Sequence, residues 1–188
     1  MNINNNYLSI IFYMLVIYFN ESYINFYPSL PIYPNSNNEL NITKKYIESR
    51  NEKDKLMFYL TNESVVYAFL PHIENENIKY LRYLTTSQNY IIIFFKYLIN
   101  RIRPWQLDST INPINIKTAN TPSFPAGHTY QACILANYLS KKYPKKKYLF
   151  EQIVLDCDYC RVKAGLHFPS DGIFSRKLFK LFNKSIIC

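Results

Sequence analysis

The sequence predicts an all-α protein that folds as one compact helical domain. Several stretches repeat apolar residues at helical spacing, and no stretch of useful length alternates polar and apolar residues as a strand would. The 10 Pro also outnumber the 3 Gly, which favours helices joined by Pro-marked loops over tight hairpins. With 188 residues, the chain is long enough to bury the core of a single domain.

Helical patterns follow one another along most of the chain, at 43–59, 75–102, 127–142, 146–163 and 171–184. The second of these is expected to break or bend near 85–87. Pro144 separates the third from the fourth, and Gly165 with Pro169 separates the last two. Residues 105–122 show no period and predict a long loop, a feature that is usually functional when it occurs inside a compact domain.

The N-terminal segment differs in composition from the rest. Residues 7–19 form an uncharged apolar run, short for a spanning helix and typical of the hydrophobic region of a signal peptide. We therefore divide the chain into a signal peptide or anchor at 1–26 and a helical domain at 27–188. No Lys or Arg precedes the run and no clear cleavage site follows it, so a buried N-terminal helix stays open. A signal would imply a secreted, periplasmic or membrane-anchored protein; otherwise the sequence leaves the compartment open.

Charge and cysteine content narrow the partners. The net charge of +9 indicates an anionic partner or surface, which leaves nucleic acid, anionic lipid and phosphorylated metabolites. The Lys-rich segment 141–147 is more typical of a solvated helix end than of a nucleic-acid site. Cys157 and Cys160 form a CxxC without a second pair of metal ligands nearby, and their spacing favours buried positions on a helix.

A first candidate group consists of Lys96 and Arg103. Seven residues apart on a helix, they are expected to project from one face, about 10 Å apart along the axis. Pro104 would place Arg103 at the helix end. Arg offers a fork and Lys a point charge to phosphate oxygens, although two such cations alone are usually solvated.

The second group is the stretch 123–129, SFPAGHT. Pro125 suits the first turn of a helix, and Gly127 allows a ligand to approach the backbone closely. The free N–H groups at a helix start attract anions, and His128 would face the same anion. A plain helix start with a surface His is the alternative.

The third group is formed by Arg161, His167 and Asp171. Arg161 closes a helix, and Gly165 lets the chain turn so that His167 follows in a loop. Asp171 could cap the last helix and hold one ring nitrogen of His167, which would free the other nitrogen for attack. Cations, backbone amides and two His residues together suit phosphoryl transfer, which depends on positioning and charge neutralisation.

Taken together, Lys96-x6-Arg103-Pro104, Pro125-Ala126-Gly127-His128 and Arg161-x5-His167-x3-Asp171 resemble the three-part signature of the type 2 phosphatidic acid phosphatase superfamily. The flanking SFPAGHT and GLHFPSD look most like class A bacterial acid phosphatases, and vanadium-dependent haloperoxidases share the same site. The resemblance covers residues 96 to about 175, and the first 90 residues show none of it.

The resemblance implies a fold and a role for each matching residue. The fold would be a compact single-domain helical bundle of the acid phosphatase and vanadium haloperoxidase type. His167 would be the nucleophile, oriented by Asp171, and His128 would protonate the leaving alcohol and then activate water. The phosphate oxygens would be held by Lys96, Arg103, Gly127 and Arg161. No metal or other cofactor is expected, and vanadate should bind as a phosphate mimic.

Two positions depart from the family pattern, because Ala126 and Cys160 stand where Ser is usual. The family Ser at the first position binds phosphate, so its loss predicts reduced activity, whereas the second change is expected to be structural. Three aromatic residues flank the motifs and are expected to line the leaving-group pocket: Trp105, Phe124 and Tyr130.

The sequence thus predicts a metal-independent acid phosphatase that hydrolyses phosphate monoesters through a phosphohistidine. The alternatives are a membrane-associated lipid phosphate phosphatase tethered by the N-terminal run, a vanadium haloperoxidase, and a basic binding protein with a decayed site. The expected partner is a phosphate ester, with membrane association open and nucleic acid disfavoured. The physiological substrate and the oligomeric state are left open.

Overall fold

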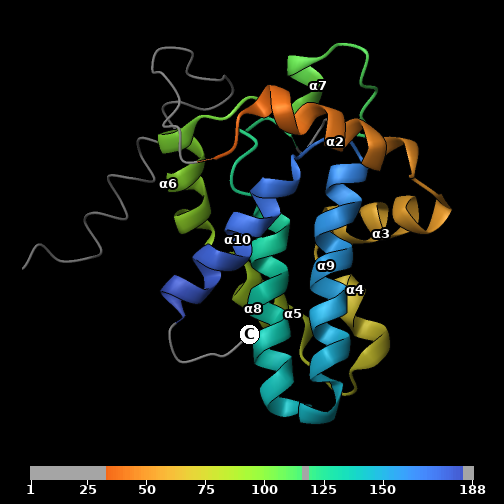
Figure 1. Ribbon diagram of the computed structural model, residues 1–188. Coiled ribbons are helices and arrows are strands. Elements are labelled where there is room, and N and C mark those ends of the chain that lie inside the picture. Colours follow the sequence, from red (N-terminus) through yellow and green to blue (C-terminus); the bar gives the residue numbers. More distant parts are fainter. Residues whose placement is uncertain (1–32, 116–118, 184–188) are drawn as a thin grey trace, which may run out of the picture.

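A computed structural model describes residues 33–115 and 119–183, and within these ranges every regular element is helical (Figure 1). The elements are α2 (Ser36–Glu48), α3 (Glu52–Glu63), α4 (Val66–Phe69), the 3₁₀ turn η1 (Leu70–His72), α5 (Ile78–Thr86), α6 (Asn89–Ile99), α7 (Pro104–Leu107), α8 (Gly127–Lys142), the 3₁₀ turn η2 (Pro144–Lys146), α9 (Lys147–Lys163) and α10 (Pro169–Phe182). The predicted all-α class is confirmed.

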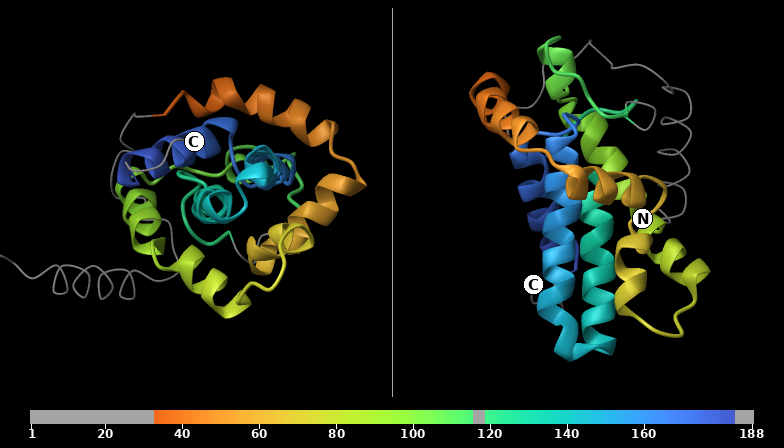
Figure 2. Two further views of the ribbon diagram at one scale, coloured as in Figure 1. Left: turned by 90° about the horizontal axis from the view of Figure 1, so that it is seen from below. Right: turned by 90° about the vertical axis from the view of Figure 1, so that its right-hand side faces the viewer.

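Helix α8 is the centre of the bundle. Viewed along its axis it is surrounded by other helices (Figure 2), and it packs against α9, α10, α5 and α6. Its small and apolar residues Ala132, Leu135, Ala136 and Leu139 are almost completely buried. A helix surrounded by others needs apolar residues around most of its circumference, which explains why α8 lacks a polar face.

Helices α2 and α3 cover one end of this bundle, where α9 ends and α10 begins (Figure 1). The prediction of one helix over 43–59 is wrong, because the chain breaks at Ser49–Asn51 and starts again. Asn51 accepts a hydrogen bond from Asp54 N (3.0 Å), and Asp54 accepts one from Asn51 N (2.9 Å). This reciprocal cap starts α3 independently of α2.

The C-terminal half follows the sequence pattern closely. Helix α8 spans the predicted 127–142, α9 and α10 begin within two residues of the predicted starts, and the predicted break near 85–87 separates α5 from α6. Lys96 and Arg103, however, do not share a helix. Asn100 adopts the left-handed conformation (φ 52°) and ends α6, because Asn tolerates this region better than most residues.

None of the helices in the described part of the chain is long and apolar enough to cross a membrane. The predicted signal peptide or anchor at 1–26 lies outside the described residues.

Candidate active site

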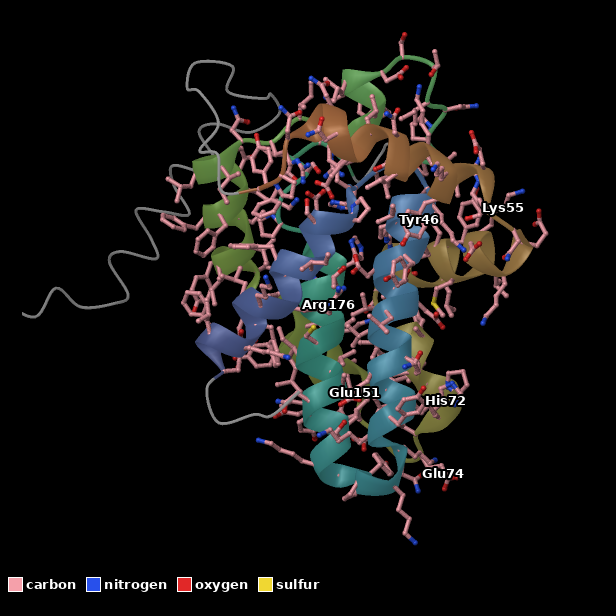
Figure 3. All side chains as sticks on the ribbon, in the orientation of Figure 1. Tyr46, Lys55, His72, Glu74, Glu151 and Arg176 are labelled. Atoms are coloured by element: carbon pink, nitrogen blue, oxygen red, sulfur yellow. The ribbon has the colours of Figure 1, made fainter. Side chains whose placement is uncertain are left out.

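The three sequence motifs meet at one cavity of about 280 Å³ between α6, the start of α8 and the end of α9. Six residues proposed from the sequence line it: Lys96, Arg103, Gly127, His128, Arg161 and His167. We call it the cationic cavity, because three of these side chains carry Lys or Arg charges. It lies at the end of the bundle covered by α2. The third histidine, His72, lies near Glu74 at the end away from Tyr46 of α2 (Figure 3).

Lys96 and Arg103 are directed into the cavity by backbone carbonyls of the loop before α8. Lys96 Nζ donates to the carbonyl of Pro122 (2.5 Å), and Arg103 Nε donates to that of Thr121 (2.9 Å). Arg103 Nη1 also donates to the carbonyl of Leu166 (2.8 Å), which ties the first motif to the third. Burial, assisted by the charge of Arg103, lowers the pKa of Lys96 well below its usual value.

Arg161 is held by α3, an element outside all three motifs. Its Nη2 donates to Thr61 Oγ1 and its Nη1 to Asn62 Oδ1, both at 3.1 Å, and its guanidinium lies 4.5 Å from the ring of Phe58. Arg161 is completely buried, yet its Nε has no hydrogen-bond partner among the described residues. A buried donor of this kind suits an anionic ligand in the cavity.

His167 and Asp171 form the predicted pair. Nδ1 of His167 lies 3.0 Å from Oδ2 of Asp171, which also accepts the backbone N–H of Phe168 at 2.9 Å. Asp171 therefore sits in the first turn of α10 rather than at its cap position. Burial lowers the pKa of His167 to about 3, assisted by the charge of Arg103 and opposed by the hydrogen bond to Asp171. Burial alone would raise the pKa of Asp171, but His167 and Arg101 hold that pKa at about 2.

His128 and Gly127 form the first turn of α8, so the helix starts after Pro125 and not at it. Burial and the charge of Arg161 lower the pKa of His128 well below its usual value, while a hydrogen bond with the Asn62 backbone acts against this. A Cβ at Gly127 would meet only Ile92, at 3.5 Å, within the protein. The backbone of Gly127 is therefore open on the cavity side.

Trp105, Phe124 and Tyr130 do not line the cationic cavity. Tyr130 is buried in the core, where its hydroxyl donates to Gln88 Oε1 (2.7 Å). Phe124 is buried with its ring 4.5 Å from that of Phe174, and Trp105 packs beside Ala164 and Leu166 in a smaller cluster. Their prediction as pocket residues rested on nearness in sequence, and their apolar rings are used for packing instead.

Sequence reasoning missed the residues that support the site from outside the motifs. Thr61 and Asn62 come from α3, and Arg101 and Glu39 form a buried network behind Asp171. Arg101 could have been noticed as a third basic residue beside Arg103, but the polar residues of α2 and α3 carry no local signal. Ala126, the position of the usual Ser, is also absent from the cavity lining, and its N–H donates to the carbonyl of Asp171 (3.2 Å).

Among the described residues, no three His, Cys, Asp or Glu side chains gather as a metal site. Cys157 and Cys160 are buried on α9, and Cys160 Sγ contacts the carbonyl of Cys157 at 3.3 Å. The expected burial of this pair on a helix is confirmed.

The helical bundle, with two histidines and three cations around one cavity, defines a class of protein that acts on phosphate esters. Residues 78–178 match the model of the PAP2 superfamily, the type 2 phosphatidic acid phosphatases. The chain belongs to this superfamily, and among its members it is a phosphatase.

One solved structure is similar over almost the whole chain. It is described as the first transmembrane PAP2-type phosphatidylglycerolphosphate phosphatase from Bacillus subtilis, and it shares 20% identity and a TM-score of 0.54, with 96% of each chain covered. At this identity the similarity supports the fold. A comparison with curated proteins found no significant match.

Proposed function

We propose that this protein hydrolyses phosphate monoesters through a phosphohistidine at His167, without a metal. The observation that carries the proposal is the placement of His167, which lines the cationic cavity while its Nδ1 lies 3.0 Å from Asp171 Oδ2. An ionised Asp171 keeps the proton on Nδ1, so Nε2 has the lone pair available for attack on phosphorus.

In the first step His167 Nε2 bonds to phosphorus as the ester P–O bond breaks, and His128 gives its proton to the leaving alkoxide. In the second, His128 takes a proton from water, the water oxygen bonds to phosphorus, and the P–N bond breaks to release phosphate. Lys96, Arg103 and Arg161 neutralise the phosphoryl oxygens in both steps, and the unpartnered Nε of Arg161 supports this role.

Substrate binding has to raise the pKa of His128, since burial and Arg161 depress it in the empty cavity. A phosphate dianion beside His128 favours the protonated ring and offsets the cations that oppose it. The proposed general acid is therefore charged only when substrate is bound or the pH is low. We expect activity to be highest at mildly acidic pH.

For the substrate we propose a phosphorylated membrane lipid, with the protein held at the membrane. Tyr90, Phe94 and Leu98 recur every fourth residue on α6 and are about half exposed, which forms an apolar stripe. The same helix lines the cationic cavity with Ile92 and Ile93. The similar bacterial protein is described as a lipid phosphate phosphatase.

A soluble phosphate ester is the second candidate. It is favoured by the SFPAGHT and GLHFPSD segments, which are similar to those of class A acid phosphatases.

His167→Ala tests the proposed reaction. We expect it to abolish release of p-nitrophenol from p-nitrophenyl phosphate, because no other side chain in the cavity is paired with a carboxylate as His167 is with Asp171. The wild type should form an acid-labile phosphoenzyme, should tolerate chelators and should be inhibited by orthovanadate. Retained turnover in the variant would refute the mechanism. Salt-dependent polynucleotide binding without any hydrolysis would favour a binding protein, and vanadate-dependent halide oxidation would favour a haloperoxidase.

Phe94→Ser tests the lipid substrate. We expect hydrolysis of phosphatidic acid in vesicles to fall while hydrolysis of p-nitrophenyl phosphate stays the same, since Phe94 is exposed on the apolar stripe. Leu56→Ser, at an exposed position on α3, is the matched control and should affect neither substrate. Equal losses on both substrates, or no preference of the wild type for vesicles, would favour the soluble ester.

A further inference from the structure

A fully buried arginine lies directly behind the proposed nucleophile pair. Arg101 follows α6 by two residues, is 0% exposed, and does not line the cationic cavity. Its Nη1 donates to Asp171 Oδ1 at 2.6 Å and to Ser170 Oγ at 2.7 Å. The guanidinium carbon also lies 4.0 Å from the ring centre of Phe168. Such a site suits the planar fork of Arg and not the point charge of Lys.

The two oxygens of Asp171 have separate partners as a result. Oδ1 accepts Arg101, whereas Oδ2 accepts the Phe168 N–H, the Ser123 hydroxyl and the ring N–H of His167. With Oδ1 occupied, the carboxylate cannot rotate to present its other oxygen without breaking a buried ion pair. Arg101 thus determines which oxygen faces His167.

Arg101 is in turn held by α2. Its Nη2 pairs with Glu39 Oε2 at 2.7 Å, and Glu39 also accepts the backbone N–H of Ser170 at 3.0 Å through Oε1. Glu39 lies outside residues 78–178, the range that matches the superfamily model. It offsets the charge of Arg101, which would otherwise add a fourth cation close to Lys96, Arg103 and Arg161.

We propose that Arg101 is a positioning residue for the reaction, and that Glu39 of α2 acts through it. Arg101 keeps Asp171 ionised and oriented, so that Asp171 holds His167 with the proton on Nδ1 and with Nε2 directed at the phosphate. This inference rests on the proposed role of His167 as nucleophile. Neither Arg101 nor Glu39 touches the substrate.

Several charged groups surround the His167–Asp171 pair and act on its titration. Arg101 and Arg103 follow α6, Lys96 lies on α6, Asp158 lies on α9, and Glu39 lies behind Arg101. Only Arg101 forms an ion pair with Asp171 at hydrogen-bond distance among these groups in the described residues. Loss of its charge should therefore make Asp171 easier to protonate.

The kinetic test compares Arg101→Met with Arg101→Lys. For Arg101→Met we expect kcat on p-nitrophenyl phosphate to fall by about 100-fold with little change in KM, because a misplaced nucleophile costs rate and not binding. The acid limb of the pH–rate profile should also move to higher pH. Arg101→Lys keeps the charge, so its acid limb should stay near that of the wild type while kcat remains reduced.

Glu39→Gln provides a second variant in case Arg101→Met does not fold. It should lower kcat in the wild-type background and have little further effect in an Arg101→Lys background, since both residues act as one unit. Lys163→Met is the matched control, because it breaks another ion pair, to Asp54 at 2.8 Å, far less buried and away from Asp171. It should leave the acid limb in place. An unmoved acid limb in folded Arg101→Met, or additive Glu39→Gln and Arg101→Lys losses, would overturn the proposal.

A measurement without turnover separates this inference from the proposed function. Nitrogen NMR of isotope-labelled histidine should show His167 as a single tautomer, protonated on Nδ1, in the wild type and as a mixture of tautomers in Arg101→Met. An inactive wild type with this spectral change would refute the phosphatase proposal and leave the positioning role intact. The same tautomer in both proteins would refute the positioning role.

Discussion

Arg161 shows how a single side chain of the site depends on residues distant in sequence. Its two terminal nitrogens donate to Thr61 and Asn62 of α3, and its Nε remains without a partner among the described residues. The guanidinium is therefore oriented by α3 with one donor left for a ligand. An Arg oriented in this way loses less side-chain entropy on binding phosphate than a mobile one.

Thr61→Val tests this orientation. Valine has nearly the same shape but no acceptor, so one hydrogen bond to a charged group is lost, which costs roughly 1.5–3 kcal/mol. We expect the inhibition constant of orthovanadate to rise by about 10-fold or more. Thr85→Val is the control, since Thr85 is also buried but its hydroxyl donates within α5, to the carbonyl of Arg82 at 2.8 Å. Equal orthovanadate inhibition of wild type and Thr61→Val would contradict the proposed role.

At the level of helices, α10 meets α9 through a close contact between Gly172 and Asp158. A Cβ at Gly172 would lie 1.7 Å from Asp158 Oδ1. The Asp158 carboxylate is buried there, accepting Thr129 Oγ1 of α8 at 3.1 Å and pairing with Arg176, which projects from α10 (Figure 3). Thr129, Gly172 and Asp158 lie beside His128, beside Asp171 and one turn before Arg161, so this contact sets the spacing of the helices that carry them.

Gly172→Ala should therefore destabilise the protein by about 1–3 kcal/mol, the usual cost of overpacking a core. In an Asp158→Ala background, which is itself destabilised because Arg176 loses its partner, the further cost of Gly172→Ala should nearly vanish. Urea unfolding of the four proteins of this cycle measures the coupling. Additive losses would show that the contact is not the cause.

Across the whole molecule, positive charge is concentrated at a site that buries two neutral histidines. The pKa of His167 is lowered to about 3 by burial, and that of His128 is lowered as well. The unfolded chain takes up protons on these histidines below about pH 6.5, and the folded protein does not until a lower pH. Asp158 acts in the opposite direction, because burial raises its pKa to about 6.

Acidification from about pH 7 to about pH 5 should consequently lower the free energy of unfolding. Two histidines gain protons in the unfolded chain, whereas one aspartate gains a proton in the folded protein, so the histidines prevail. Thermal unfolding over this range measures the slope, which should be smaller for His128→Gln. A melting temperature that rises on acidification would contradict the depressed histidine pKa values.

Much of the fold could be predicted because it follows from local patterns. The limits of α8, the break between α5 and α6, and the starts of α9 and α10 depend on Pro, Gly and apolar spacing within a few residues. The single helix over 43–59 is wrong for an equally local reason, the Asn51–Asp54 cap, which the charged pattern conceals.

The shared helix face of Lys96 and Arg103 is wrong, yet both residues line the cationic cavity. Their convergence depends on the carbonyls of Pro122, Thr121 and Leu166 and not on helical spacing. The three aromatic residues fail as pocket residues for a related reason, since nearness in sequence does not determine the direction of a buried ring.

The chemistry of the three motifs resides in residue types, order and short spacings, so the chain alone was sufficient to identify two histidines, a carboxylate and three cations as one set. Which acceptors orient them is a matter of packing between distant segments. Glu39 reaches Asp171 through Arg101, and Thr61 reaches Arg161, across 62 and 100 residues of chain for the contacts Arg101–Glu39 and Arg161–Thr61. Hydrogen bonds over such separations leave no periodic trace in a sequence, because any polar side chain on α2 or α3 looks solvated until the helices are in place.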